Sequence, residues 1–404
     1  MRIAVVGAGA AGLMSAATAA KTADVVLYEK NEKVGKKIYI TGKGRCNVTN
    51  MCEPPEFLEN VVNGKKFMYG AIYAFPPRKT VEFLENNGVE TKVERGNRVF
   101  PQSDKSSDVI KALKRAIDRE GVCVCFEKVL KIRREDDCFV VVTDISAEKF
   151  DRVILACGGV SYPATGSTGD GYAFAKSFGH KIVPPRAALV PILLKDNVCS
   201  LEGLSLKNVN ATISVSGKSF SEFGEMLFTS KGVSGPIILS LSSQINKFDL
   251  KGTKLSIDLK PALSREKLDL RILSDFDKYK NKQYKNALGD LLPAKLIDCF
   301  VRYTKIDENK PVNSITRKER ETIEESMKSL NFTVSSLDKT ELGIVTAGGV
   351  DLSEVNPKTM ESKLVPGIYF AGEMLDVDAL TGGFNLQIAF ATGYVAGMHA
   401  GELL

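Results

Sequence analysis

The apolar residues at the start of the chain follow the order of a β–α–β unit. Residues 2–6 form a short apolar run typical of a buried parallel strand, and residues 10–20 are alanine-rich with helical spacing. A second apolar run follows at residues 24–29. Because parallel neighbours need a crossover helix, this order predicts the opening of an α/β domain.

The next segments alternate between helical and strand patterns. A proline pair separates two helical patterns, over residues 65–74 and residues 79–87. Asp104 has the position of an N-cap for a helix that runs to about residue 119. Residues 122–156 predict short antiparallel strands that lead back into a buried strand.

The second half of the chain changes in composition and then changes back. Residues 189–260 are rich in Ser, Gly and Val and predict β structure, whereas residues 261–340 are rich in Lys and predict helices. Signals of a nucleotide-binding α/β fold return in residues 341–404. We therefore expect residues 1–188 and 341–404 to form one discontinuous domain, interrupted by an inserted substrate or cap domain.

Composition excludes several classes of protein. With 404 residues, 44% hydrophobic and 26% charged, the chain is expected to be globular rather than disordered. It contains no apolar run of about 18 residues, so we expect no membrane span and a cytoplasmic location. Eight cysteines without CxxC spacing predict free thiols. Only His180 and His399 are available, both interpreted as structural, so no metal site is expected.

The basic charge of the chain is concentrated in one segment. The formal net charge is +6, and residues 278–320 alone contain eleven basic and five acidic residues. A solvated helical face is the main interpretation, which makes nucleic acid an unlikely partner. Tyr279, Tyr284 and Tyr303 lie among these charges, however, so an RNA-binding basic insertion is kept as a minor alternative.

A glycine motif at the first strand carries the strongest chemical signal. Gly7, Gly9 and Gly12 form GxGxxG between a strand and a helix, and Glu29 ends the next strand. In this setting the first glycine permits a tight turn, the second lets the backbone approach a pyrophosphate, and the third lets helix and strand pack closely. Glu29 would accept a hydrogen bond from an adenosine ribose hydroxyl. The motif predicts a bound dinucleotide.

Three further glycine-rich segments help to choose between NAD and FAD. They are residues 41–47, residues 156–159 and residues 367–385, the last of which leads into a helix that we expect to run to Gly393. A helix N-terminus after two glycines can face the negative charge of a reduced flavin. Several separated glycine-rich strand ends fit an extended FAD better than an NAD held by one β–α–β unit. No second GxGxxG motif predicts a dedicated NAD domain.

Specific motifs in the chain resemble those of one bacterial flavoprotein family, which contains aminoacetone oxidase-like and 3-dehydro-bile acid Δ4,6-reductase-like proteins. The motifs are EKxxxxGKK, TGKGRCNVTN, RVFPQSDK, GVSGP, TAGGV and GEMLDVDALTGGFNLQIAFATG. The resemblance spans nearly the whole chain. It implies a discontinuous, glutathione-reductase-type (Rossmann-like) FAD-binding domain, interrupted by a β-rich, barrel-like and helical insertion.

The same resemblance implies which residues surround FAD. They are Gly7, Gly9, Ala11, Gly12, Glu29, Lys30, Lys37, Gly44, Arg45, Cys46, Asn47, Val129, Ala156, Gly158, Gly372, Glu373, Asp376, Asn385, Gln387 and Ile388. Two positions depart from the family pattern. Ser230 follows Leu-Phe-Thr where the family commonly has His, and Ala379-Leu380 stands where it commonly has Gly-Tyr, so catalytic roles of that His or Tyr do not transfer.

The family contains two reactions, and the residues leave both open. The leading hypothesis is NAD(P)H-linked reduction of an activated C=C bond in a hydrophobic, steroid-like enone, with NADH or NADPH as a transient donor. The alternative is O2-dependent oxidation of a small amine. Because no conventional base is evident, hydride delivery is favoured. Tyr162 is the candidate catalytic residue, and Cys46 is either a redox thiol or, the favoured interpretation, a packing residue.

Overall fold

The computed structural model describes residues 1–402, which divide into two compact units. Unit 1 comprises residues 1–188 and 339–402, and unit 2 comprises Leu189–Asp338. Each unit has its own cluster of buried apolar side chains. Over the described part of the chain, no helix has both the length and the apolar character to cross a membrane.

Unit 1 is built on a five-stranded sheet in the order β20-β11-β1-β2-β7. All four pairings are parallel. Ile3, Ala4 and Val5 in the central strand are fully buried, as expected for a strand covered on both faces. The strands are β1 (Arg2–Val6), β2 (Asp24–Tyr28), β7 (Cys123–Cys125), β11 (Arg152–Leu155) and β20 (Ile368–Phe370).

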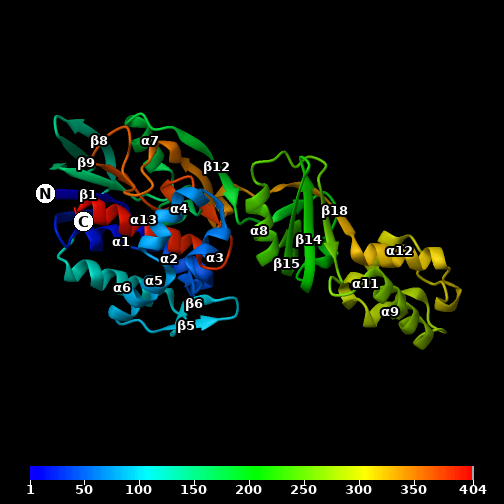
Figure 1. The fold of residues 1–404 in the computed structure, drawn as a ribbon. Coiled ribbons are helices and arrows are strands. Elements are labelled where there is room, and N and C mark those ends of the chain that lie inside the picture. The colour runs from blue at the N-terminus through cyan, green and yellow to red at the C-terminus, as the bar shows by residue number, and fades with distance from the viewer. Residues whose placement is uncertain (403–404) are drawn as a thin grey trace. The chain divides into compact units, whose positions relative to one another are not determined.

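Two long helices from opposite ends of the chain, α1 (Ala10–Ala19) and α13 (Phe384–Ala400), pack side by side in unit 1 (Figure 1). The expectation that the last helix ends at Gly393 is wrong. A Cβ atom on Gly393 would lie 2.5 Å from the carbonyl oxygen of Ala11, and one on Gly397 would lie 2.4 Å from that of Ser15. These glycines therefore permit close helix contact instead of terminating the helix.

Smaller sheets and helices complete unit 1. Residues 122–132, which the apolar pattern predicts as one strand, contribute to two different sheets. β7 joins the parallel sheet, whereas β8 pairs with β9 in an antiparallel sheet that also contains β10. The helices are α2 (Lys36–Ile40), α3 (Pro54–Glu59), α4 (Lys65–Ala74), α5 (Pro77–Asn86), α6 (Ser106–Arg119) and α7 (Asp170–Ser177). The strands are β3 (Thr49–Asn50), β4 (Val61–Asn63), β5 (Thr91–Glu94), β6 (Arg98–Pro101), β8 (Val129–Glu135), β9 (Cys138–Thr143), β10 (Ala147–Phe150), β12 (Ile182–Ala188), β19 (Val345–Val350) and β21 (Asp378–Ala379).

Unit 2 contains a closed six-stranded barrel in the order β13-β16-β15-β14-β17-β18. Its strands are β13 (Ile192–Leu194), β14 (Ser205–Val215), β15 (Lys218–Thr229), β16 (Gly232–Ser234), β17 (Lys254–Asp258) and β18 (Leu330–Leu337). The expectation that all of residues 261–340 are helical is wrong at β18. Leu330, Phe332 and Val334 are buried at every second position, which is the period of a strand facing a core.

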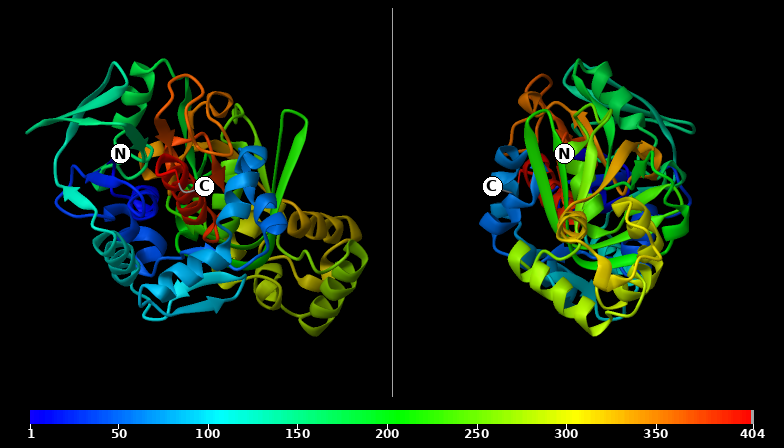
Figure 2. Two further views of the ribbon diagram at one scale, coloured as in Figure 1. Left: turned by 60° about the vertical axis from the view of Figure 1, so that its left-hand side comes forward. Right: turned by 90° about the vertical axis from the view of Figure 1, so that its right-hand side faces the viewer.

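The helices of unit 2 carry much of its charge. They are α8 (Pro236–Ile245), α9 (Arg265–Lys278), α10 (Tyr284–Ala287), α11 (Ala294–Thr304) and α12 (Arg317–Lys328). Figure 2 shows the later helices, in yellow-green and yellow, grouped together. Their apolar sides contain buried residues such as Leu268, Phe300 and Ile323, which belong to the same apolar cluster as the barrel interior.

Candidate functional site

The candidate site of unit 1 lies where three parallel strands end. Since β1, β11 and β20 run parallel, their carboxyl ends lie at the same edge of the sheet. Gly7 follows β1, Ala156 and Gly158 follow β11, and Gly372 follows β20. A Cβ atom on Gly7 would lie 2.6 Å from the carbonyl oxygen of Ala156. The structure thus brings together strand ends that are far apart in the sequence.

The three glycines of the first turn meet different surroundings. Gly7 has a φ of +101°, which favours glycine, and a Cβ on Gly12 would lie only 1.8 Å from the carbonyl oxygen of Gly7. Gly9 is different, because a Cβ there would meet no atom within 4 Å. Two of the glycines are therefore required by the fold itself, and the third leaves open space at the N-terminus of α1, where a pyrophosphate would lie.

Glu29 holds this turn from the next strand. Its carboxylate accepts hydrogen bonds from the backbone N–H of Ala8 at 2.9 Å and from the backbone N–H of Asn31 at 2.9 Å. The residue is only 8% exposed. Because a carboxylate has about four acceptor positions, Glu29 can hold the turn and still accept from a ribose hydroxyl.

A cavity of about 370 Å³ lies next to Glu29 in unit 1. The Lys30 ammonium donates to Asp170 at 2.7 Å and also to Thr168. Val129 is buried at the start of β8, next to the lining residue Lys128. The lining residues are Lys30, Asn31, Lys128, Pro163, Gly166, Thr168 and Asp170.

Lys37 and Glu373 form the central ion pair of the site. The Lys37 ammonium lies 2.7 Å from a carboxylate oxygen of Glu373 and donates to the Ser161 hydroxyl at 2.6 Å. Ser161 in turn donates to the other carboxylate oxygen at 2.9 Å. Burial alone raises the pKa of Glu373, but Lys37 and the hydrogen bonds from Thr346 and Ser161 outweigh it and hold that pKa below its ordinary value. Glu373 is therefore ionised at neutral pH.

Two acidic residues after β20 also fix the neighbouring strand β19. The backbone N–H of Thr346 donates to Glu373 at 2.6 Å, and that of Gly348 donates to Asp376 at 2.9 Å. The Thr346 hydroxyl accepts from the backbone N–H groups of Val160 and Ser161. Sequence reasoning missed Ser161 and Thr346 as members of this cluster, although Thr346 begins the quoted TAGGV motif.

Tyr162 follows directly after this cluster. It has a φ of +52°, in the left-handed region, and its backbone N–H donates to the carbonyl of Glu341 at 3.0 Å. A non-glycine residue held in this region is under backbone strain, and such strain often accompanies function. The phenol is half-buried, and Tyr162 stays the predicted catalytic residue.

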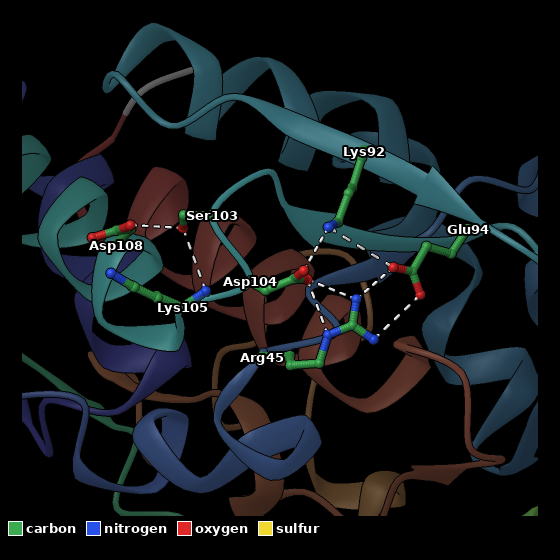
Figure 3. A network of polar contacts seen from close by, with 7 residues as sticks. All are labelled: Arg45, Lys92, Glu94, Ser103, Asp104, Lys105 and Asp108. Carbon is green, nitrogen blue, oxygen red and sulfur yellow. Dashed lines mark hydrogen bonds and ion pairs between the residues drawn. The ribbon is translucent and has the colours of Figure 1, made fainter.

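Arg45 belongs to a polar network in the loop after α2 (Figure 3). Its guanidinium contacts Glu94 and donates to Asp104 at 2.6 Å, and it lies over the Phe100 ring at 4.2 Å. Lys92 donates to the same Asp104 at 2.6 Å. The charge of Arg45 is thus used within the protein. Gly44, beside it, has a φ of +86°.

The expectation that Asp104 caps α6 is wrong. The helix begins at Ser106 with Lys105 at its N-cap and without a side-chain cap. Asp104 instead pairs with Lys92 and Arg45, which hold its pKa below the ordinary value (Figure 3). Hydrogen bonds between ionised partners are stronger than one that a carboxylate accepts from a backbone N–H group. Asp104 therefore bonds to Arg45 and Lys92 and does not cap the helix.

Three predicted residues lie in the first turns of α13. Asn385 is fixed by β21, since Ala379 donates to its side-chain oxygen at 3.0 Å. Gln387 is fully buried, and its amide bonds to Thr49, Thr80 and the carbonyl of Phe75. Ile388 is 3% exposed. Any polar contact of Gln387 with a cofactor would therefore come from its backbone.

Asn47 carries an unused acceptor in this region. Its side-chain oxygen is buried and has no hydrogen-bond partner among residues 1–402. A Cβ atom on Gly383, the N-cap of α13, would lie 2.8 Å from that oxygen. A buried acceptor without a partner destabilises the protein unless a donor from elsewhere reaches it. The N3–H group of a flavin is a donor of this kind.

Cys46 does not have the properties of a redox thiol. It is fully buried, and burial raises its pKa to about 12. The thiolate is the reactive form of cysteine, so at neutral pH Cys46 is inert. This agrees with its interpretation as a packing residue. Within the described residues, no group of three or more His, Cys, Asp or Glu side chains is arranged to hold a metal ion.

The basic segment of unit 2 forms ion pairs within the unit. Tyr284 is fully buried, so its predicted role as a stacking ring is wrong, whereas Tyr279 donates its hydroxyl to Asp290 and Tyr303 is exposed. The pairs are Lys278 with Asp290 at 2.8 Å, Lys285 with Asp298 at 2.8 Å, Lys310 with Glu319 at 2.6 Å and Arg320 with Asp269 at 2.5 Å.

The residues of unit 1 fit FAD better than a nucleotide of half its length. Open space over Gly9 suits a pyrophosphate, Glu29 and the adjacent cavity suit an adenosine, and the free acceptor of Asn47 suits a flavin edge. Ala11 contacts the segment after β20, since a Cβ on Gly372 would lie 2.7 Å from its side chain.

Comparisons with known proteins agree with this geometry. Residues 1–399 match a family model described as HI0933-like protein Rossmann domain. A 3-dehydro-bile acid delta(4,6)-reductase from Clostridium scindens is 33% identical over 417 residues, covering 99% of each chain. A ribosomal RNA dihydrouridine synthase from Haemophilus influenzae is 29% identical over 402 residues, covering 98% of this chain and 97% of the relative.

A solved structure supports the fold. The 3-ketosteroid-delta4-(5alpha)-dehydrogenase of Rhodococcus jostii has a TM-score of 0.52 at 14% identity, covering 99% of this chain and 96% of that chain. The predicted resemblance and the predicted α/β FAD-binding fold with an inserted barrel are thus confirmed. The chain belongs to the family described as HI0933-like protein Rossmann domain, and it is an FAD-dependent oxidoreductase.

Proposed function

We propose that this oxidoreductase reduces a carbon–carbon double bond conjugated to a carbonyl group, with NADH or NADPH as the electron donor. One observation carries the proposal: the full-length relative at 33% identity is named as a delta(4,6)-reductase of a 3-dehydro-bile acid. A steroid-like enone is the first candidate substrate. A bound FAD would supply the hydride chemistry that links a reduced nicotinamide to the electron-poor carbon of the substrate.

The residues of the site have complementary tasks in this reaction. The N-terminus of α13, with Gly383 at its N-cap, would supply backbone N–H groups to hold the negative charge of a bound reduced flavin. The Lys37–Glu373 pair keeps the strand ends in a fixed geometry without adding a net charge. Tyr162 is the proposed proton donor to the second carbon of the double bond, because it directly follows Ser161 in the chain and is half-buried.

A second candidate substrate is a uracil ring in RNA. The relative from Haemophilus influenzae is named as a ribosomal RNA dihydrouridine synthase and matches almost the whole chain. A dihydrouridine differs from uridine by two hydrogens across a double bond conjugated to a carbonyl. Both candidates therefore need the same hydride and proton transfer, and they differ in how the substrate is bound.

Anaerobic stopped-flow absorbance at the oxidised flavin band tests the electron donor. We expect the protein to bleach rapidly with NADH or with NADPH, whereas free FAD at the same concentration reacts slowly. Failure of both nicotinamides to bleach a visible flavin would contradict the proposal and favour direct reduction by an organic substrate such as an amine. The Tyr162→Phe variant is expected to bleach at the normal rate and to form less reduced product, which separates proton donation from hydride transfer.

The substrate candidates are separated by product analysis. The NAD(P)H-reduced protein is incubated without oxygen with a 3-keto-4-ene steroid and, separately, with unmodified ribosomal RNA. Mass spectrometry then detects either a steroid that is two hydrogens heavier or dihydrouridine among the nucleosides. Formation of neither product by a protein that bleaches normally would contradict both candidates.

A further inference from the structure

Helix α4 in unit 1 exposes two aromatic rings to solvent. Tyr69 and Tyr73 are 57% and 46% exposed, far more than the other large apolar residues of this helix. Their ring centroids are 4.5 Å apart with an interplanar angle of 25°, so the rings are stacked. Residues four apart lie on the same side of a helix. We call this side, formed by Lys65, Lys66, Tyr69, Gly70 and Tyr73, the α4 face.

Exposed basic residues occur on α4, in the first turn of α5 and beside the segment that contacts Gly70. Lys66 is exposed on the same side of α4, and Arg78 is exposed in the first turn of α5. Lys358 is also exposed and is adjacent to Pro357, whose carbonyl oxygen would lie 3.4 Å from a Cβ on Gly70. Lys65 pairs with Glu59 at 2.5 Å, but Lys66, Arg78 and Lys358 have no carboxylate partner within 4 Å among residues 1–402.

We propose that the α4 face binds unpaired nucleotides of an RNA, with bases stacked on Tyr69 or Tyr73 and phosphates near Lys66, Arg78 and Lys358. This inference rests on the second candidate function. Stacked aromatic rings flanked by cations are the combination that proteins use to bind single-stranded nucleic acid, because every base has a flat face and every linkage a negative charge.

The α4 face is a better candidate than the basic segment of unit 2. In unit 2 Lys285 and Lys310 are paired with carboxylates, and the Tyr279 ring is covered by the ammonium of Lys282 at 4.2 Å from its centroid. On the α4 face both rings are exposed, and Lys66 has no carboxylate partner within 4 Å among residues 1–402. The only large exposed apolar side chains of this face are the two tyrosines, which argues against a lipid surface.

The test compares RNA binding by full-length, FAD-loaded variants. The probe is a fluorescein-labelled, uridine-rich single-stranded RNA of about 12 nucleotides, and its Kd is measured by anisotropy at low salt. Tyr69→Ala combined with Tyr73→Ala is expected to weaken binding at least tenfold, roughly the loss of one stacked base. Tyr69→Phe with Tyr73→Phe keeps the rings and is expected to retain binding. Tyr303→Ala, in the basic segment of unit 2, is the matched control and is expected to change little.

Each other outcome is decisive. If the wild-type protein binds the probe and the double alanine variant binds it equally well, the α4 proposal is wrong while the RNA candidate survives. If the wild-type protein does not bind at low salt, the RNA candidate fails together with the α4 proposal, and the enone candidate is unaffected. If the alanine pair instead abolishes self-association seen by light scattering without RNA, the α4 face is a contact between copies and the proposal is overturned.

Discussion

The two units of this protein use their polar residues in opposite ways. In unit 1 the glycine turn leaves open space at Gly9, and Asn47 keeps a buried acceptor without a partner among the described residues. In unit 2 the charged helices pair Lys285 and Lys310 with neighbouring carboxylates. Polar groups that hydrogen-bond to one another stabilise a fold. An open space, or a buried polar group without a hydrogen-bond partner, instead indicates a bound ligand.

The comparison also explains why charge alone is a poor guide to binding. The net positive charge of residues 278–320 is prominent in the sequence. Five of its eleven cations, Lys278, Lys285, Lys310, Arg317 and Arg320, are held in ion pairs, which contribute little to stability at a surface. On α4, by contrast, Lys66 has no carboxylate partner within 4 Å among residues 1–402 and shares its side of the helix with two exposed rings.

The largest expected effect is loss of the flavin when the open space in unit 1 is filled. Gly9→Val is expected to lower the bound flavin by at least tenfold, about 1.4 kcal/mol or more of binding energy, because the side chain occupies the position of the pyrophosphate. Gly289→Val in unit 2 is the matched control, since a Cβ there also meets no atom within 4 Å. The absorbance ratio of flavin to protein measures both. A yellow Gly9→Val protein with full flavin content would show that the pyrophosphate does not lie over Gly9.

Removal of Lys37 is expected to destabilise unit 1 in a pH-dependent way. Lys37 helps hold the pKa of Glu373 below its ordinary value, so the stability from this pair is present above about pH 4.5 and is lost as the pH falls through the lowered pKa. Lys37→Met should therefore lower the free energy of unfolding by about 2 kcal/mol at neutral pH, and by less near pH 4.

Urea denaturation of the flavin-loaded protein at both pH values measures this loss. Lys36→Met is the control, because Lys36 only pairs with the exposed Glu32 at 3.3 Å. It should cost less than about 0.5 kcal/mol at either pH. Equal losses from the two variants would show that the Lys37–Glu373 pair has no special role.

Substitution of Glu29 is expected to have a smaller effect on both stability and flavin retention. Glu29→Ala leaves the buried N–H of Ala8 without its acceptor, which costs about 1–2 kcal/mol. Glu29→Gln keeps one acceptor oxygen and should lose less. Flavin release during dialysis and urea denaturation distinguish the two variants. If both retained flavin like the wild type, Glu29 would hold only the turn.

The smallest effect is expected in unit 2. Lys285→Ala removes surface ion pairs with Asp298 and Glu308 and should leave the urea midpoint of unfolding nearly unchanged. The flavin content should not change. A substantial loss of flavin would show that the charged helices of unit 2 contribute to the cofactor site, and the contrast between the units would then be wrong.

Features that depend on contacts between residues close in the sequence could be predicted, and features that depend on contacts between distant residues could not. The roles of Gly7 and Gly12 were predictable because they depend on a contact between neighbours five residues apart. The cluster of Ser161, Thr346 and Glu373 was not, because its members come from distant segments and meet only in the folded sheet. The same reason applies to Asp104, whose local capping position was overridden by Arg45 from another loop.

The oxidative half-reaction of the flavin tests most directly whether this protein reduces a carbon–carbon double bond conjugated to a carbonyl group. The bound flavin is photoreduced without oxygen and then mixed with a 3-keto-4-ene steroid or with unmodified ribosomal RNA, while absorbance at the oxidised flavin band is recorded. We expect this absorbance to return with at least one of these acceptors, together with a product that has gained two hydrogens. A flavin that stays reduced with both acceptors, and is oxidised only when O2 is admitted, would contradict the proposed reduction of a conjugated double bond.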